Sequence, residues 1–154
     1  PERAVFIDYL QPAYYQCNPA FYGKARAVAG IKDYEDLRGR EVGYVLNSAY
    51  FAPFDEDLGI DKHGVPTEAQ LQRMVERGHL PLMIGTDCQV DYALSRRNAG
   101  ALVKADYLPP SPVVLYLGIS KRSPHHGLGP VLAKALHEMV ISGEIGTLAK
   151  PYQP

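Results

Sequence analysis

The feature that most constrains the fold is an alternation of strand-like and helix-like segments between residues 41 and 103. A nearly continuous apolar run at 41–46, Glu41-Val42-Gly43-Tyr44-Val45-Leu46, is typical of a strand that helices cover on both faces. Short apolar runs at 82–84 and 101–103 predict two more strands, and helical patterns at 50–58, 67–78 and 87–97 separate them. This alternation predicts an α/β fold built on a doubly wound, mostly parallel sheet.

The helix at 67–78 has clear signals at both ends. Thr67 and Gln70 form a capping box, in which the Thr hydroxyl accepts from a backbone N–H and the Gln side chain reaches back. Gly78 ends the helix, because glycine adopts the left-handed backbone conformation that closes many helices.

The helix predicted at 50–58 has its apolar residues at 51, 54 and 58 on one face. A further helix follows a strand-like run at 113–121 and a Ser123-Pro124 turn. Its spacing predicts one long apolar stripe made of Leu128, Val131, Leu132, Ala135, Leu136, Met139 and Val140.

Composition limits the classes of partner. The 154 residues suffice for one ordinary domain with a core, and the net charge is −1. Nucleic acid or an anionic membrane as the main partner would demand clustered Lys and Arg, which the chain lacks. Cys17 and Cys88 are too few for a disulfide framework, so two unpaired thiols are favoured. A single bridge in an oxidising compartment is the alternative.

Sequence motifs for metal, cofactor or nucleophilic chemistry are missing. His125 and His126 are adjacent, but neighbouring histidines on a loop rarely point the same way, and no carboxylate or cysteine stands at ligand spacing. We expect a solvated turn there, and neither a metal nor a cofactor. The sequence also contains no G-x-S-x-G elbow and no phosphate-binding G-x-x-x-x-G-K-[ST] loop.

Four segments occur in an order that is informative as a set. Pro1-Glu2-Arg3-Ala4, Phe6 and Pro12-Ala13-Tyr14-Tyr15 are similar to a T-x-E-R…F-S-x-P-Y segment, and 31–45 matches I-x-x-x-E-D-L-x-G-x-x-V-G-V. Residues 67–94 form a helix–strand–helix that ends in Asp91-Tyr92, and 113–152 supply a strand and terminal helices. In this order they resemble the bacterial extracellular solute-binding proteins of family 3, which serve ABC importers of polar amino acids.

The resemblance implies a periplasmic, two-lobed protein of the type II periplasmic-binding-protein fold, in which most of the first lobe precedes Pro1. Residues 1–26 would then form the end of lobe 1 and the first hinge crossing. Residues 27–107 would form lobe 2, and 108–154 the return hinge strand with the C-terminal helices of lobe 1. With that lobe incomplete, the apolar stripe at 128–140 has less to pack against, so we expect a homodimer, segment exchange or marginal stability.

Two loops are candidate binding sites, because ligands of open α/β sheets bind beyond the carboxyl ends of the strands. The first is Asn47-Ser48-Ala49, which the family uses for an anion; backbone N–H groups and a small hydroxyl at a helix start suit a carboxylate. The alternative is that Ser48 only caps a helix. The second loop contains Thr86 and Asp87.

In the family an acidic residue of this second loop accepts the ligand's ammonium group. Counting back from Asp91-Tyr92 places that acid at Thr86, one position before Asp87. Either the loop is shifted, the ligand lies outside the common amino acids, or Asp87 is only a helix N-cap. Tyr14 matches a hinge-side aromatic of the family, and core packing is its alternative interpretation.

The resemblance implies a substrate-binding component that delivers an amino acid or related polar solute to the membrane permease of an ABC importer. One alternative is a periplasmic sensing module of a signalling receptor. A less favoured one is an enzyme similar to cyclohexadienyl dehydratase, which would need a general acid in its cleft. Asp87 is the only obvious candidate for that acid, and we therefore expect no enzyme.

Overall fold

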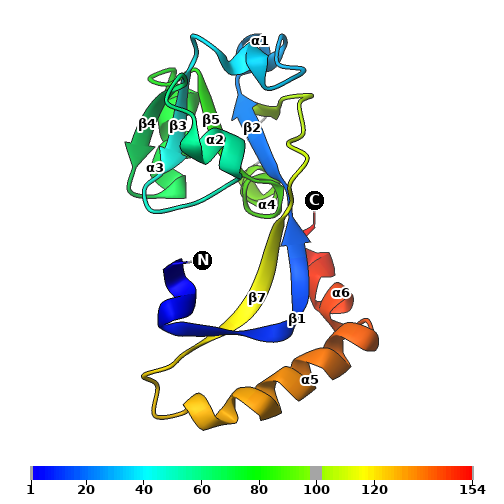
Figure 1. Ribbon diagram of the computed structural model, residues 1–154. Helices are drawn as coiled ribbons and strands as arrows, with labels where there is room; N and C mark the ends of the chain where they lie inside the picture. Colours follow the sequence, from blue (N-terminus) through cyan, green and yellow to red (C-terminus); the bar gives the residue numbers. More distant parts are fainter. Residues whose placement is uncertain (1, 98–101, 154) are drawn as a thin grey trace. The chain divides into compact units, whose positions relative to one another are not determined.

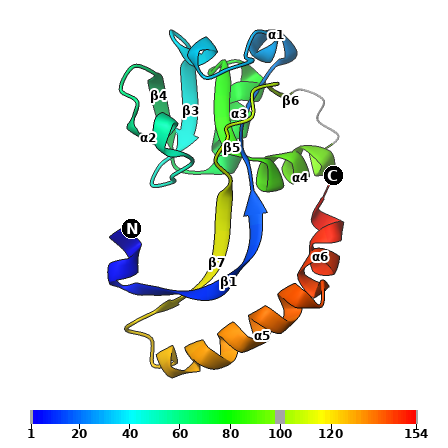
Figure 2. The same cartoon turned by 45° about the vertical axis from the view of Figure 1, so that its right-hand side comes forward.

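The computed structural model describes residues 2–97 and 102–153, and Figures 1 and 2 show its elements from two directions. Strands, α-helices and 3-10 helices (η) follow one another along the chain. Their bounds are η1 Glu2–Val5, β1 Ile7–Cys17, β2 Pro19–Gly23, α1 Ala25–Val28, η2 Glu35–Leu37, β3 Glu41–Val45, α2 Ala52–Glu56, β4 Asp61–Val65, α3 Glu68–Arg77, β5 Leu82–Thr86, α4 Asp87–Arg97, β6 Val103–Lys104, β7 Val113–Ser120, η3 His126–Leu128, α5 Gly129–Ile141, α6 Glu144–Ala149 and η4 Lys150–Tyr152.

The described chain divides into two compact units. The sheet unit comprises residues 17–97 and 102–113, and the tail unit comprises residues 2–16 and 114–153. β1 and β7 carry the chain from one unit to the other. The chain therefore changes unit after residues 16 and 113.

A five-stranded sheet in the order β4-β3-β5-β2-β6 forms the centre of the sheet unit. β3 is parallel to both β4 and β5, while β2 is antiparallel to both β5 and β6. The expected α/β class is confirmed, but the sheet is mixed, with its parallel part limited to three strands. The antiparallel strands come from the segments that enter and leave the unit, and chain order alone does not place them next to β5.

Both faces of this sheet are covered, which confirms the interpretation of the apolar strands. Side chains along a strand alternate between faces, so Phe21 of β2 packs in one core while Ala20 and Tyr22 pack in the other. Helices α1 and α2 contribute to the first core, and α3 and α4 to the second. The central buried members are Phe21, Val28, Val42, Phe54, Leu82 and Ile84 in the first core, and Tyr22, Leu71, Val75, Met83 and Val90 in the second.

Helix α3 begins and ends where the sequence predicts. The Thr67 side chain accepts a hydrogen bond from the backbone N–H of Gln70 at 3.2 Å, and Gly78 has a φ of 79°. Helix α2 is shorter than expected and ends at Glu56. Leu58 is consequently 97% exposed and does not share a buried face with Phe54, which corrects the expected helix at 50–58.

Two strands differ from the sequence prediction. β4 has the polar sequence Asp61-Lys62-His63-Gly64-Val65, which carries no apolar alternation and was missed. It lies at the edge of the sheet and pairs with β3 alone, so its side chains need not be buried. β6 covers Val103–Lys104 rather than 101–103; Ala101 lies outside the described residues.

The tail unit contains a two-stranded sheet of β1 and β7 together with α5 and α6. The rings of Tyr9 and Tyr116 pack edge to face across these strands, with centroids 6.2 Å apart. Leu136 of α5 is buried, but much of the predicted apolar stripe is exposed, including Leu128, Val131 and Leu132. Among the described residues, no helix combines the length and apolar character that crossing a membrane requires.

Candidate functional site

Three connections lie at one edge of the sheet, where the parallel strands β3, β4 and β5 end. They are the loop at 46–51 after β3, the two-residue link Pro66-Thr67 into α3, and the direct passage from β5 into α4. Parallel neighbours place their carboxyl ends at the same edge, which is where open α/β sheets bind ligands. The predicted site residues Asn47, Ser48, Ala49, Thr86 and Asp87 all belong to this edge.

The loop after β3 is a turn followed by an exposed segment. Asn47 has a φ of 62°, and the backbone N–H of Ser48 donates to the Val45 carbonyl at 3.2 Å. Residues 47–49 are exposed. Because α2 begins only at Ala52, with Phe51 as its N-cap, Ser48 does not cap that helix. The expectation that this loop opens a helix is therefore wrong, and its role as an anion site stays a prediction.

Tyr50 fixes the far end of this loop. Its hydroxyl accepts from the Val45 N–H at 3.1 Å, and its own N–H donates to both carboxylate oxygens of Asp55, at 3.2 and 3.0 Å. Tyr50 is buried, and burial raises the pKa of its phenol. The exposed residues 47–49 are thus held between two anchored points, a geometry that pre-organises their backbone groups.

Asp87 opens α4 with a carboxylate that already accepts three N–H donors. Oδ1 accepts from the backbone of Asn18 at 2.8 Å and of Cys88 at 2.7 Å, and Oδ2 accepts from the Asn18 side chain at 2.9 Å. The Asp87 N–H in turn donates to the Asn18 carbonyl at 2.9 Å. Asp87 therefore joins the start of α4 to the start of β2, and its contact with a ligand ammonium stays a prediction.

A disulfide between Cys17 and Cys88 lies beside this contact, with the two Cα atoms 5.6 Å apart. The favoured expectation of two unpaired thiols is wrong, because the fold brings these residues together across a sequence separation of 71. The bridge and the Asn18–Asp87 hydrogen bonds fix the same junction. Disulfides of this kind persist in oxidising compartments.

The other two predicted residues differ in their surroundings. The hydroxyl of Thr86, the last residue of β5, donates at 3.3 Å to the side-chain oxygen of Gln89 in the first turn of α4. Tyr14 is partly buried on β1, in the tail unit. The carboxyl-end loops of the sheet unit therefore bring together five of the six predicted residues.

A polar group within the second core was not predicted from sequence. The Tyr22 hydroxyl donates to Asp91 Oδ1 at 2.7 Å, Asp91 Oδ2 is ion-paired with Lys104, and the Lys104 ammonium lies 5.8 Å from the centroid of the Tyr22 ring. Burial, followed by the hydrogen bond to Asp91, raises the pKa of Tyr22, so the phenol stays protonated. This set is internally satisfied and ties α4 to β2 and β6.

Glu68, the first residue of α3, is the second acidic side chain at the carboxyl edge. It is partly buried, its Oε1 is shielded from solvent without a hydrogen-bond partner, and burial raises the pKa of its carboxyl group. A Cβ on residue 85 would lie 3.2 Å from Oε1, so glycine in β5 allows the carboxylate to lie over that strand. The sequence shows Glu68 only as part of the capping box, and an unpaired buried oxygen has no sequence signal.

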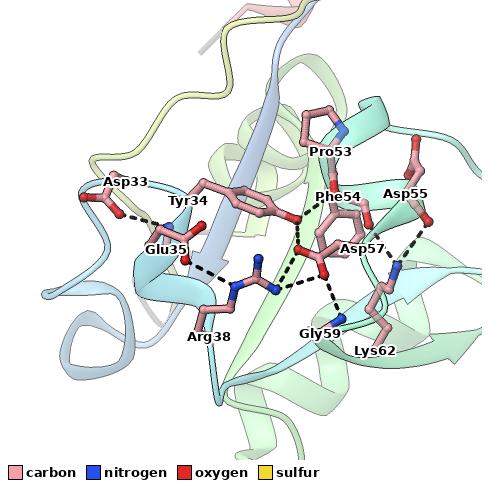
Figure 3. Close-up of polar contacts among 10 residues, drawn as sticks. All are labelled: Asp33, Tyr34, Glu35, Arg38, Pro53, Phe54, Asp55, Asp57, Gly59 and Lys62. Atoms are coloured by element: carbon pink, nitrogen blue, oxygen red, sulfur yellow. Dashed lines mark hydrogen bonds and ion pairs between the residues drawn. The ribbon is translucent and has the colours of Figure 1, made fainter.

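A different polar cluster occupies the opposite, amino end of β3 and β4 (Figure 3). Arg38 Nη1 lies 2.8 Å from Asp57 Oδ2, and the Tyr34 hydroxyl is 2.9 Å from the same oxygen and 2.8 Å from the Pro53 carbonyl. Asp57 Oδ1 also accepts from the Gly59 N–H at 2.7 Å. The hydrogen bond from Arg38 is the main reason that the pKa of Asp57 falls to about 2.

Lys62 extends this cluster along β4. Its ammonium donates to the carbonyls of Phe54 and Asp55 at 2.8 and 3.1 Å and lies 5.1 Å from the centroid of the Phe54 ring (Figure 3). These carbonyls belong to the last turn of α2, where a cation is favourable. Since the donors and acceptors named here satisfy one another, the cluster fastens α2 and η2 to the sheet.

The histidine turn and the cysteines carry the side chains that most often bind metals. His125 and His126 are exposed, as expected for a solvated turn, and His126 Nε2 lies 2.7 Å from Asp8 Oδ2. Among the described residues, one group of three potential ligands has its atoms within 4.8 Å of one another: Cys17, Asp87 and Cys88. Two of these are joined in the disulfide, which removes the thiolates that a metal would need.

No family model and no curated protein matches the chain. Solved structures match its fold. It is similar to the amino acid ABC transporter substrate-binding protein AbpA from Streptococcus pneumoniae bound to L-arginine, with a TM-score of 0.81 and 19% identity over 98% of this chain and 62% of that one. The ligand-binding core of GluR0 with L-glutamate matches with a TM-score of 0.83 and 15% identity, over 100% of this chain and 68% of that one.

The chain has the fold of a type II periplasmic binding protein. The periplasmic VFT2 domain of BvgS from Bordetella pertussis is also similar, with a TM-score of 0.79 and 20% identity over 99% of this chain and 63% of that one. The chain thus spans 62–68% of the length of these three proteins. The fold expected from the sequence resemblance is confirmed.

Proposed function

We propose that this chain is the second lobe, with hinge strands and C-terminal helices, of an extracytoplasmic binding protein for an amino acid or related small polar solute. Its partner would be the membrane permease of an ABC importer. The disulfide supports the extracytoplasmic location, because such bridges persist outside the reducing cytosol. No covalent chemistry is required.

One observation carries the proposal: the exposed backbone of residues 47–49 and the N-termini of α3 and α4 lie at one edge of the sheet, beyond the carboxyl ends of parallel strands. That edge offers N–H donors and two carboxyl groups to a small zwitterion. In proteins of this fold, AbpA was solved with L-arginine and the GluR0 core with L-glutamate.

The proposed mechanism is ligand-dependent closure of two lobes. A ligand that is contacted from both sides favours the closed state by its differential affinity for that state. The permease would then recognise the closed form. In this mechanism the sheet unit supplies one side of the ligand site, already in its binding geometry.

A thermal-shift screen of the purified protein against amino acids, polyamines, opines and small organic acids tests the proposal. Ligand at 100 times its Kd stabilises the folded state by about 2.7 kcal/mol, which is a shift of several degrees for a chain of this size. We expect a selective shift with one ligand class. If no compound of the panel shifts the melting temperature, the proposed solute-binding function is contradicted.

A sensory function is the second candidate, and the similarity to the BvgS VFT2 domain favours it. Both functions include ligand binding, so the thermal-shift screen does not separate them. The gene does: a membrane helix followed by a signalling domain beyond residue 154 would establish the receptor, and an adjacent permease gene the importer.

A further inference from the structure

We propose that Glu68 is a ligand-binding residue, and that it recognises a protonated amine or guanidinium group at the carboxyl edge of the sheet. The proposal rests on the proposed solute-binding function and names the chemical class of the solute. It also assigns the cation-recognising position to the link between β4 and α3.

The first step compares the two acidic groups at this edge. Asp87 accepts three N–H donors from Asn18 and Cys88, so both of its carboxylate oxygens already have hydrogen-bond donors. Glu68 is the opposite case, because Oε1 is buried without a donor and, among the described residues, no ion pair includes it. A buried carboxylate oxygen without a donor is costly, and a cation offsets this cost.

The second step concerns Gln72, one helical turn further along α3. Its side chain is 1% exposed, it hydrogen-bonds the Glu68 carboxyl group, and its own Oε1 has no donor. Two side chains that are hydrogen-bonded to each other therefore each have a buried oxygen without a donor. Only an N–H or O–H donor satisfies such a pair, and an anionic ligand group is repelled by it.

The third step is the position of Glu68 among the strand ends. It comes after the two-residue link that follows β4, and its Oε1 lies over Gly85 near the end of β5. Its charge also acts on Tyr50, which anchors the loop after β3, and on Tyr22 of β2. These phenols remain protonated, as burial raises both pKa values, and neither supplies a positive charge. Glu68 is thus close to all of the connections that form this side of the proposed ligand site.

The test compares Glu68→Gln with a matched control, Glu76→Gln, two turns further along the same helix. The probes are L-arginine, L-lysine and putrescine as cations, with succinate as a ligand that lacks an amine. Without ligand at pH 7, Glu68→Gln should raise the melting temperature, because it removes an uncompensated charge. It should also weaken the best cationic probe at least about tenfold, while Glu76→Gln leaves that affinity unchanged.

Each other outcome overturns the assignment. If a cationic probe binds the wild type and Glu68→Gln equally, Glu68 is not in the site and the solute-binding function stands. Selective binding of succinate alone would likewise support the solute-binding function, but it would exclude Glu68 from the site. A lower melting temperature of ligand-free Glu68→Gln, with cation affinity unchanged, would make the carboxylate a structural group. If neither the probes nor the wider panel shifts the melting temperature of the wild type, both proposals are overturned.

Discussion

The sheet unit and the tail unit bury their apolar residues to very different degrees. In the sheet unit, Phe21, Leu71 and Leu82 are fully buried, and helices cover both faces of the sheet. In the tail unit, α5 and α6 bury Leu136 but leave Val131, Ile141 and Leu148 at least half exposed.

The sheet unit therefore buries its own apolar side chains, whereas the apolar side chains of the tail unit need a further surface to pack against. The sheet unit meets the requirement of two packed layers around a sheet by itself. The tail unit presents an amphipathic helix whose apolar stripe is mostly uncovered, as expected from the resemblance to longer binding proteins. This chain spans only 62–68% of the length of the related proteins, and the homodimer or segment exchange expected from sequence stays a prediction.

The largest expected effect comes from the disulfide, which belongs to the sheet unit alone. Replacing Cys17 and Cys88 with Ala should lower the free energy of unfolding by about 4 kcal/mol, the model value for closing a loop of about 70 residues. Amide hydrogen exchange should then accelerate in β2, β5 and α4. Wild-type protein treated with a thiol reductant is the control, and an equal acceleration in α5 would show that the two units do not respond separately.

A matched pair of Leu→Ala substitutions measures the contrast in packing directly. Leu71→Ala on α3 removes a side chain that is fully buried and should cost about 3 kcal/mol in chemical denaturation. Leu132→Ala on α5 removes one that is 39% exposed and should cost less than about 1 kcal/mol at low protein concentration. A cost for Leu132→Ala that grows with protein concentration would identify a second copy as the cover.

The smallest expected effects come from one carboxylate in each unit. The folded-state pKa of Asp57 is about 2, below the ordinary 3.8, so its contribution to stability is present above about pH 4 and is lost as the pH falls toward 2. Asp8 also has a lowered pKa, chiefly because of its hydrogen bond to His126, but its side chain is 44% exposed against 15% for Asp57.

Unfolding curves of Asp57→Asn and Asp8→Asn between pH 2 and pH 7 test this pair. The difference from wild type should shrink toward pH 2 for both variants and be larger for Asp57→Asn, because solvent screens the exposed pair. A larger effect for Asp8→Asn would mean that the tail unit is better protected from solvent than its own residues provide.

Sequence periodicity predicted the elements that carry a regular apolar pattern. β3, β5, α3 and the long helix α5 were found in this way, because burial on one or both faces selects residues at fixed spacing. β4 was missed, since an edge strand in contact with a single neighbour does not need apolar side chains. The end of α2 was misplaced because Asp57 bonds to Arg38 and Gly59, contacts that no local pattern encodes.

For the candidate site, the sequence by itself determined the two loops and the residue types, because loops after parallel strands are placed by chain order and strand direction. Only the tertiary structure decided which of those residues have unused bonding capacity. It paired Cys17 with Cys88, supplied Asp87 with donors from Asn18, and left the buried oxygens of Glu68 and Gln72 without donors. Such pairings depend on distances between residues far apart in sequence, and these distances exist only after folding.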